Sequence, residues 1–130
     1  GSYMVGVGAG GSCASWPLCR GSLIPDGFVY AVHMGHRYIA VFATAFLAYV
    51  ALTFIISGRT IRPLKRTSHL ALGLMGLQLI VGALTVWSGF SVHLRVTHLS
   101  IATLVWMGTV LMAAAATAAF GNNTVDEHDV

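Results

Sequence analysis

Long apolar stretches, separated by short polar or glycine-rich segments, make up most of the sequence. Three of them, at residues 38–57, 70–90 and 96–120, contain no charged side chain other than histidine. Each is long enough to cross a hydrocarbon core, which takes about 20 apolar residues. With flanking residues added, the expected helices run over about 28–57, 67–87 and 92–120. The pattern predicts an all-α integral membrane protein with three transmembrane helices.

Composition and charge agree with this class. The 130 residues are 56% hydrophobic and 8% charged, whereas about a quarter of the residues of a soluble domain are charged. Basic residues gather between the first two expected helices, at Arg59, Arg62, Lys65 and Arg66. The positive-inside rule assigns this loop to the cytoplasmic side. No broad basic face accompanies the net charge of +3, so no nucleic-acid partner is expected.

This orientation divides the chain into three parts. Residues 1–29 form an extracytoplasmic cysteine loop, in which the glycines, Pro17 and Pro25 exclude a long regular element. Residues 30–120 form the helical domain, and residues 121–130 form a polar cytoplasmic tail. We expect a multi-pass protein of the cell membrane or an organellar inner membrane. We also expect a piece of a longer protein, because residues 1–6 resemble the end of a preceding helix.

The two cysteines, Cys13 and Cys19, both lie in the extracytoplasmic loop. Disulfides persist on the oxidising side of a membrane, and so close a spacing forms a small ring easily. We therefore favour a disulfide over two free thiols. Two cysteines without further ligands do not predict a zinc site. Trp16, between them, suits either an interfacial anchor or a contact with a cofactor.

Two histidines lie near the outer ends of the first and third helices. His36 and His98 are each about 10 Å below the helix start, at about 1.5 Å per residue. Ionisable side chains at membrane depth indicate a functional role. In an up-down-up arrangement the two helices run parallel, and Ala40 and Ala102 leave room beside the imidazoles for a flat ring. The pair predicts two axial ligands of one heme, held between facing helices.

Other interpretations of these histidines stay open. Either one could be a hydrogen-bonded core residue, and small residues spaced four apart also let membrane helices pack closely. A copper or zinc site would need His33 or His93 as a third ligand. A second heme on the inner side is not favoured, because only His69 and His128 are available there.

Heme propionates would need positively charged partners near the outer surface. Arg95, one turn before His98, and Arg37 are the candidates, because arginine binds carboxylates through paired hydrogen bonds. The alternative for both is contact with lipid headgroups. Gln78, at mid-membrane depth, is expected to bond a neighbouring helix. The candidate cofactor-binding residues are Arg95, Arg37, His33 and Trp16.

Several short motifs follow one another in a specific order. They are Gly8-Ala9-Gly10-Gly11-Ser12-Cys13, Trp16-Pro17-Leu18-Cys19, Gly35-His36-Arg37, Leu77-Gln78, Gly82-Ala83-Leu84-Thr85-Val86 and Thr97-His98-Leu99. In this order they resemble the heme A synthase family, and the resemblance covers residues 1 to about 120. The family oxidises a methyl group of heme O to a formyl group, which gives heme A for cytochrome oxidase.

The resemblance implies a larger architecture. Family members usually have two similar halves, each an antiparallel four-helix heme-binding bundle with an external cysteine pair and two heme-facing histidines. This chain resembles the last three helices of one half. His36 and His98 match the heme ligands, and Cys13 and Cys19 match the disulfide pair. The implied partners are lipid and a preceding helix or half-domain of the same protein, with a second copy or respiratory-complex subunits as further partners.

One position departs from the pattern of the half associated with catalysis. That half has a glutamate three residues before its first histidine, where this chain has His33. The stretch therefore resembles the C-terminal half, which binds heme b, and no catalytic residue is assigned. We expect the heme b-binding half of a heme A synthase. The alternative is a non-catalytic bis-histidine membrane cytochrome subunit, for electron transfer or assembly of a respiratory complex.

Overall fold

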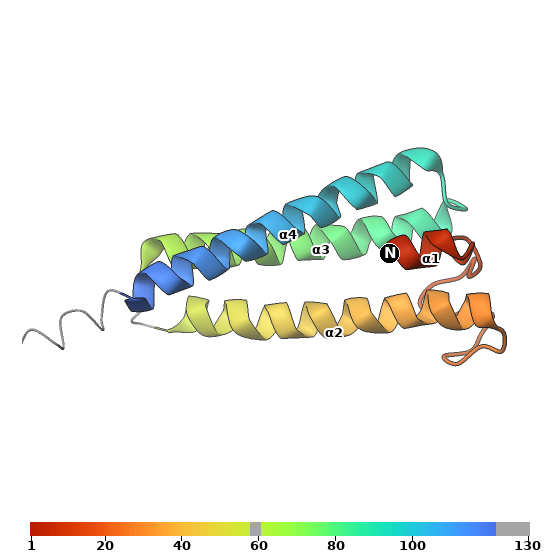
Figure 1. The fold of residues 1–130 in the computed structure, drawn as a ribbon, viewed down its shortest axis with the longest axis horizontal. Coiled ribbons are helices and arrows are strands. Elements are labelled where there is room, and N and C mark those ends of the chain that lie inside the picture. The colour runs from red at the N-terminus through yellow and green to blue at the C-terminus, as the bar shows by residue number, and fades with distance from the viewer. Residues whose placement is uncertain (58–60, 122–130) are drawn as a thin grey trace, which may run out of the picture. The chain divides into compact units, whose positions relative to one another are not determined.

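Four helices and their connections make up the protein in a computed structural model, which describes residues 1–57 and 61–121 (Figure 1). The helices are α1 (Ser2–Gly6), α2 (Phe28–Ile56), α3 (Arg62–Trp87) and α4 (Val92–Gly121). No strand occurs within these residues. Cys19 and Ser22 form only an isolated pair of backbone hydrogen bonds.

Three of the helices are long and apolar enough to cross a membrane. By length and composition these candidate spans are Phe28–Ile56, Arg62–Trp87 and Val92–Ala119. The predicted all-α class with three membrane-spanning helices is confirmed. Arg59 of the basic loop and the tail from residue 122 lie outside the described residues.

The beginning of α3 differs from the sequence prediction. The helix starts at Arg62, five residues before the expected start at 67, so Pro63 belongs to the helix. Proline is tolerated in a first helical turn, because its fixed φ is helical and the N–H it lacks would have no partner within the helix there. The start expected at 67 is therefore wrong.

The end of α3 is set by a glycine. Gly89 has a φ of +67°, in the left-handed region that favours glycine. The N–H of Phe90 donates to the carbonyl of Thr85, and that of Gly89 donates to Val86. This is the hydrogen-bond pattern of a Schellman motif, which ends a helix and satisfies its last carbonyls. The chain turns there and enters α4 at Val92.

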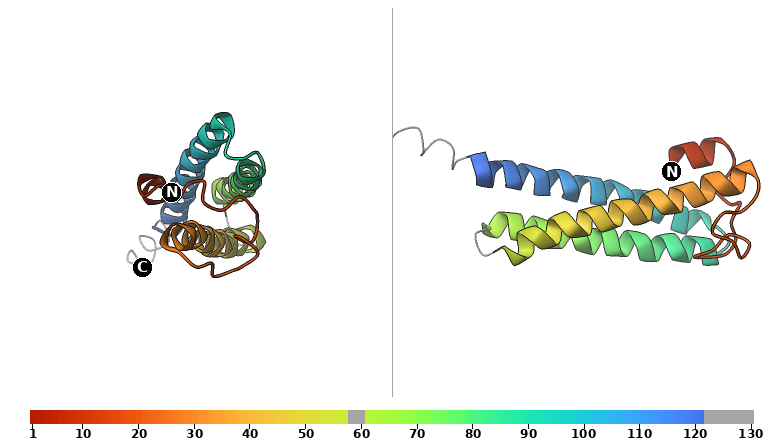
Figure 2. Two further views of the ribbon diagram at one scale, coloured as in Figure 1. Left: turned by 90° about the vertical axis from the view of Figure 1, so that its right-hand side faces the viewer. Right: turned by 90° about the horizontal axis from the view of Figure 1, so that it is seen from below.

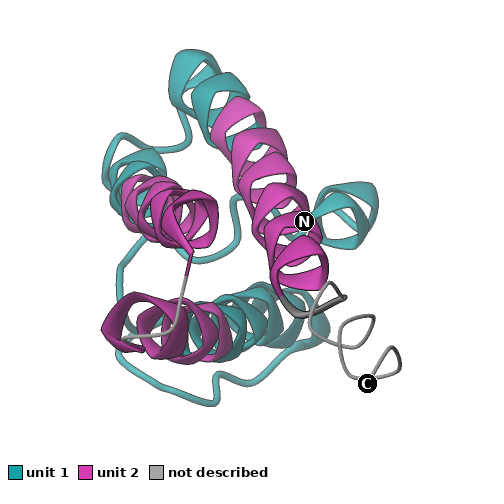
Figure 3. Cartoon of the chain, turned by 90° about the vertical axis from the view of Figure 1, so that its left-hand side faces the viewer, with its two compact units in different colours: residues 1–45, 79–99 teal, residues 46–78, 100–130 magenta. Residues whose placement is uncertain are grey.

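The chain divides into two compact units, and each long helix contributes to both (Figure 3). Residues 46–78 and 100–130 make one unit. Its core consists of Leu47, Ala51, Leu64, Ala71 and Met112. An added Cβ at Gly108 would lie 3.6 Å from the Cα of Ala71, so a small residue there lets α4 pack directly on α3.

Residues 1–45 and 79–99 make the other unit. In it the N-terminal segment lies beside the beginning of α2 and the turn between α3 and α4 (Figures 1 and 2). Cys13, Cys19 and Met34 are buried there, with Tyr30 packed against them. Both predicted heme-ligating histidines belong to this unit.

Candidate functional site

His36 and His98 come from α2 and α4 and lie in the same unit. Both are partly buried. The amino group of Gly1 and the side chains of His98, His33 and Arg37 all lie within electrostatic range of His36. The structure therefore places in one unit the two residues that the sequence pairs as ligands.

The imidazole of His98 lies against a glycine of α3. A Cβ added at Gly82 would be 3.1 Å from Cε1 of His98 and 3.5 Å from Nδ1. A side chain at this position would press on the ring, which would have to move by a few tenths of an ångström. The sequence marks Gly82 only as part of a motif, because its contact with His98 depends on how α3 and α4 face each other.

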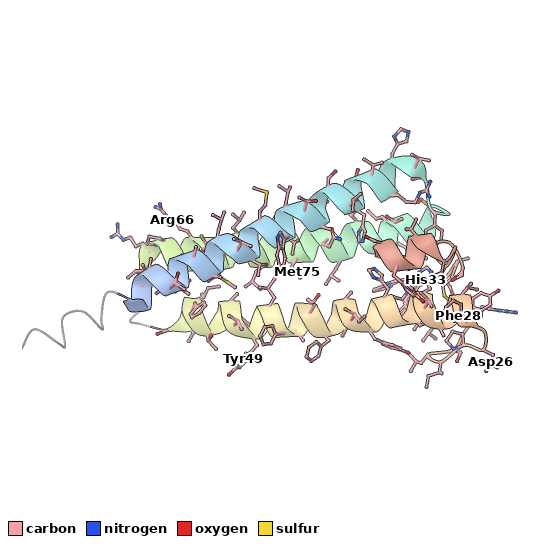
Figure 4. All side chains as sticks on the ribbon, viewed as in Figure 1. Asp26, Phe28, His33, Tyr49, Arg66 and Met75 are labelled. Carbon is pink, nitrogen blue, oxygen red and sulfur yellow. A yellow bond between two sulfur atoms is a disulfide. The ribbon has the colours of Figure 1, made fainter. Side chains whose placement is uncertain are left out.

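His33 is buried, with 3% of its surface exposed. Its Nδ1 lies 3.0 Å from the carbonyl oxygen of Ala9, and its Nε2 lies 3.3 Å from Nη2 of Arg37. The edge of its ring also contacts Phe90, with centroids 5.9 Å apart. Figure 4 labels His33 near the beginning of α2. Both ring nitrogens are thus engaged with the protein itself.

Arg37 donates hydrogen bonds to backbone carbonyl oxygens of the cysteine loop from both terminal nitrogens. The shorter bonds run from Nη1 to Pro17 and from Nη2 to Ser15, each 2.8 Å long. Longer bonds run to Leu18 at 3.3 Å and to Cys13 at 3.4 Å. The sequence carries no sign of these contacts, because the acceptors belong to the main chain.

A disulfide joins Cys13 and Cys19, whose Cα atoms are 5.0 Å apart. Neither cysteine has any exposed surface. Trp16, at the tip of the loop, is 45% exposed, and its ring meets that of Trp87 edge to face with centroids 5.9 Å apart. The loop is therefore attached to α2 through Arg37 and to the end of α3 through this aromatic pair.

Comparison with curated proteins identifies the family. A heme A synthase of Macrococcus caseolyticus is 32% identical over 97 residues, which are 73% of this chain and 32% of that protein. A heme A synthase of Novosphingobium aromaticivorans is 31% identical over 135 residues, covering 88% of this chain and 35% of that protein. The chain belongs to the heme A synthase family.

A third heme A synthase, from Erythrobacter litoralis, is 28% identical over 128 residues. The chain spans 32 to 36% of the length of these curated relatives. No family model matches the chain, and no solved structure matches it. Together with the three apolar helices, membership of the heme A synthase family makes this a multi-pass membrane protein.

Heme A synthase membership implies a heme-related cofactor, and the residues of the unit formed by residues 1–45 and 79–99 fit one. The imidazoles of His36 and His98 come from separate helices. Gly82 leaves the space in which the His98 ring lies. Among the described residues, a Cβ added at Gly35, next to His36, would meet no atom within 4 Å apart from its own helix backbone and chain neighbours. No group of three histidine, cysteine or acidic side chains suited to a metal ion occurs in the described part of the chain, whereas a heme takes only two protein ligands.

Arg95 lies three residues before His98 on α4. Its side chain is exposed. An arginine at this position has the charge and the donors that a carboxylate group needs. Arg37, by contrast, has its terminal nitrogens at the carbonyl groups of the loop.

Proposed function

We propose that the chain binds heme b through His36 and His98, and that it is the heme b-binding half of a heme A synthase. Such an enzyme oxidises heme O to heme A for cytochrome oxidase. The observation that supports the proposal is that the two histidines lie in one unit, within electrostatic range of each other, with the His98 ring against Gly82. Two neutral imidazoles on separate helices are the ligand set of a six-coordinate, low-spin heme.

In this proposal the protein binds and orients, while the heme, when bound, supplies one-electron chemistry. His36 and His98 would hold the iron. Arg95 would donate hydrogen bonds to a propionate at the outer edge of the site. Trp16 and the disulfide-closed loop cover that edge and limit the access of water.

The proposed orientation has the cysteine loop outside and the basic start of α3 inside. Arg62, Lys65 and Arg66 support it, because basic residues favour the cytoplasmic side of a membrane. The three spans and one preceding helix would form an antiparallel four-helix bundle. The proposed partners are lipid and a further half of the same protein, with a second copy or subunits of a respiratory complex as additional partners.

A second candidate is a non-catalytic cytochrome subunit with the same heme ligands. One observation favours it: residues 28–121 contain no aspartate or glutamate, so the spans offer no carboxylate for proton transfer. The two candidates differ in the reaction of the chain together with its neighbouring half. Conversion of added heme O to heme A in membranes containing both supports the enzyme, and bound heme b without conversion supports the subunit.

The heme proposal is tested by absorption and paramagnetic resonance spectra of the purified chain loaded with heme. The parent chain should give a six-coordinate low-spin spectrum. His36→Ala and His98→Ala should each lose heme or become high-spin, because each removes one axial ligand. His93→Ala, an exposed position on α4, is the control and should keep the parent spectrum. An unchanged low-spin spectrum in both ligand variants would overturn the proposal.

A further inference from the structure

We propose that Arg37 and His33 form a latch that holds the cysteine loop on α2, and that Arg37 is a positioning residue for the site rather than a partner of a heme propionate. The latch itself is a property of the protein without heme. Its consequence for heme rests on the function proposed above.

The terminal nitrogens of Arg37 already donate hydrogen bonds within the protein. A guanidinium group binds a carboxylate bidentately through both terminal nitrogens, or through Nε and one of them. Both terminal nitrogens donate at 2.8 Å to loop carbonyls, Nη1 to Pro17 and Nη2 to Ser15. Each terminal nitrogen has a second hydrogen, and these face Leu18 from Nη1 and His33 from Nη2, each at 3.3 Å. Either bidentate geometry would therefore displace at least one contact that Arg37 already makes. The structure therefore assigns the guanidinium group of Arg37 to backbone carbonyl oxygens of the loop.

His33 fixes the orientation of Arg37. A carbonyl oxygen can only accept, so the contact with Ala9 at 3.0 Å requires the hydrogen to be on Nδ1 of His33. Neutral Nε2 then has a lone pair facing Nη2 of Arg37 at 3.3 Å. Ser12 adds a second attachment to α2 nearby, because its hydroxyl lies 3.1 Å from the carbonyl oxygen of Val29. The tautomer of His33 with its hydrogen on Nδ1 is therefore compatible with both contacts, the one with Ala9 and the one with Arg37.

The latch and the proposed ligand lie on neighbouring faces of α2. His33 and Arg37 are four residues apart and share one face. His36 lies about 60° from His33 and about 100° from Arg37 around the helix. The latch and the proposed ligand are therefore adjacent on α2.

The same contacts keep the disulfide enclosed. The oxygens of Cys13, Ser15, Pro17 and Leu18 all face the guanidinium group, inside the ring that the disulfide closes. Both sulfur-bearing residues are fully buried in this arrangement. Thiol–disulfide exchange requires a thiolate to reach a sulfur atom, so the loop must leave α2 before reduction occurs. The reduction rate therefore reports how often the latch opens.

The first test measures this rate in the full chain in detergent without heme. Phosphine reduces Cys13–Cys19, and a maleimide traps the thiols. Arg37→Met should be reduced faster than the parent by about tenfold or more, because charge-assisted hydrogen bonds are lost. Arg37→Lys keeps the charge but not the planar fork and should fall between the two. Arg66→Met, an exposed arginine of α3, is the control and should match the parent.

The second test separates positioning from propionate binding. Heme and its dimethyl ester, which lacks both carboxylates, are titrated into the parent and into Arg37→Met. If Arg37 positions the loop, Arg37→Met should change the affinity for heme and the affinity for the dimethyl ester by the same factor. A loss confined to the form with carboxylates would assign Arg37 to a propionate and overturn this part of the proposal.

The two proposals fail in different measurements. Equal reduction rates in heme-free parent, Arg37→Met and Arg37→Lys would overturn the latch, whatever the heme spectra show. If Arg37→Met yields no folded protein by circular dichroism, Arg37→Lys alone decides, and a parental rate overturns the latch. Low-spin heme in both His36→Ala and His98→Ala would overturn the heme site and leave the reduction rates unaffected.

Discussion

The imidazole of His98 lies directly against α3 at Gly82, where an added Cβ would be 3.1 Å from Cε1. Gly82 thus occupies a position at which even the smallest side chain would push on a proposed heme ligand. Glycine in the middle of a helix is unfavourable relative to alanine. Here the space that it leaves for the imidazole accounts for its presence.

Gly82→Ala is therefore expected to weaken heme binding by about tenfold, because overpacking costs about 1–3 kcal/mol. The low-spin fraction should fall with it, as the displaced His98 ring loses its alignment. Gly76→Ala, at a glycine of α3 with open space around it, is the matched control and should bind heme like the parent. Heme titration followed by absorption measures both. Equal affinities would show that the ring moves aside without cost.

Arg95→Met is expected to weaken heme binding by about tenfold through loss of a charge-assisted contact. The same variant should bind heme dimethyl ester as the parent does, since no carboxylate is present to be recognised. Titration of the two ligands into the two proteins gives this comparison. A similar loss for both ligands would mean that Arg95 supports α4 instead of binding a propionate.

Sidedness is testable with single introduced cysteines, because both native cysteines are in the disulfide. A membrane-impermeant maleimide added to intact cells should label Ser91→Cys, in the turn before α4. It should label Ile61→Cys, just before α3, only after permeabilisation. This outcome follows from the basic residues at the start of α3. The opposite labelling pattern would invert the proposed orientation and move the histidine pair to the inner side.

Removal of the disulfide is expected to destabilise the loop without abolishing the helices. A cross-link over so short a loop contributes about 2–3 kcal/mol in the chain-entropy model. Cys13→Ser should therefore lower the thermal midpoint and loosen heme binding, and reduced parent protein should behave in the same way. Calorimetry and heme titration provide the measurements. Unchanged binding with an altered heme potential would instead indicate a redox switch.

The sequence predicted the parts of this protein that depend on side-chain composition. Apolar length alone defined three spans, and histidines within such spans pointed to His36 and His98. The start of α3 at Arg62 is not evident from the sequence, because proline disfavours a helix interior, whereas the first helical turn accepts Pro63.

The latch could not be predicted, because its acceptors are backbone oxygens. Every residue has a carbonyl group, so nothing in the identities of Ser15 or Pro17 marks them as partners of Arg37. Their convergence depends on the fold of a loop closed by the disulfide. His33 was considered for cofactor contact on the basis of its position, while its nitrogens contact Ala9 and Arg37.

The latch joins the side chains of Arg37 and His33 to main-chain oxygens of the loop, and its two sides therefore differ in how well they tolerate mutation. Exchange of Ala14, Ser15 or Leu18 for another residue leaves the carbonyl group in place, so the acceptors survive most single codon changes. A substitution of Arg37 removes the donors themselves, because they belong to its side chain. A saturation library of this region should therefore show permissive positions at Ala14, Ser15 and Leu18 of the loop and intolerant positions at Arg37 and His33 of α2. Genetic variation in the loop could alter its outer surface without releasing it from the membrane domain.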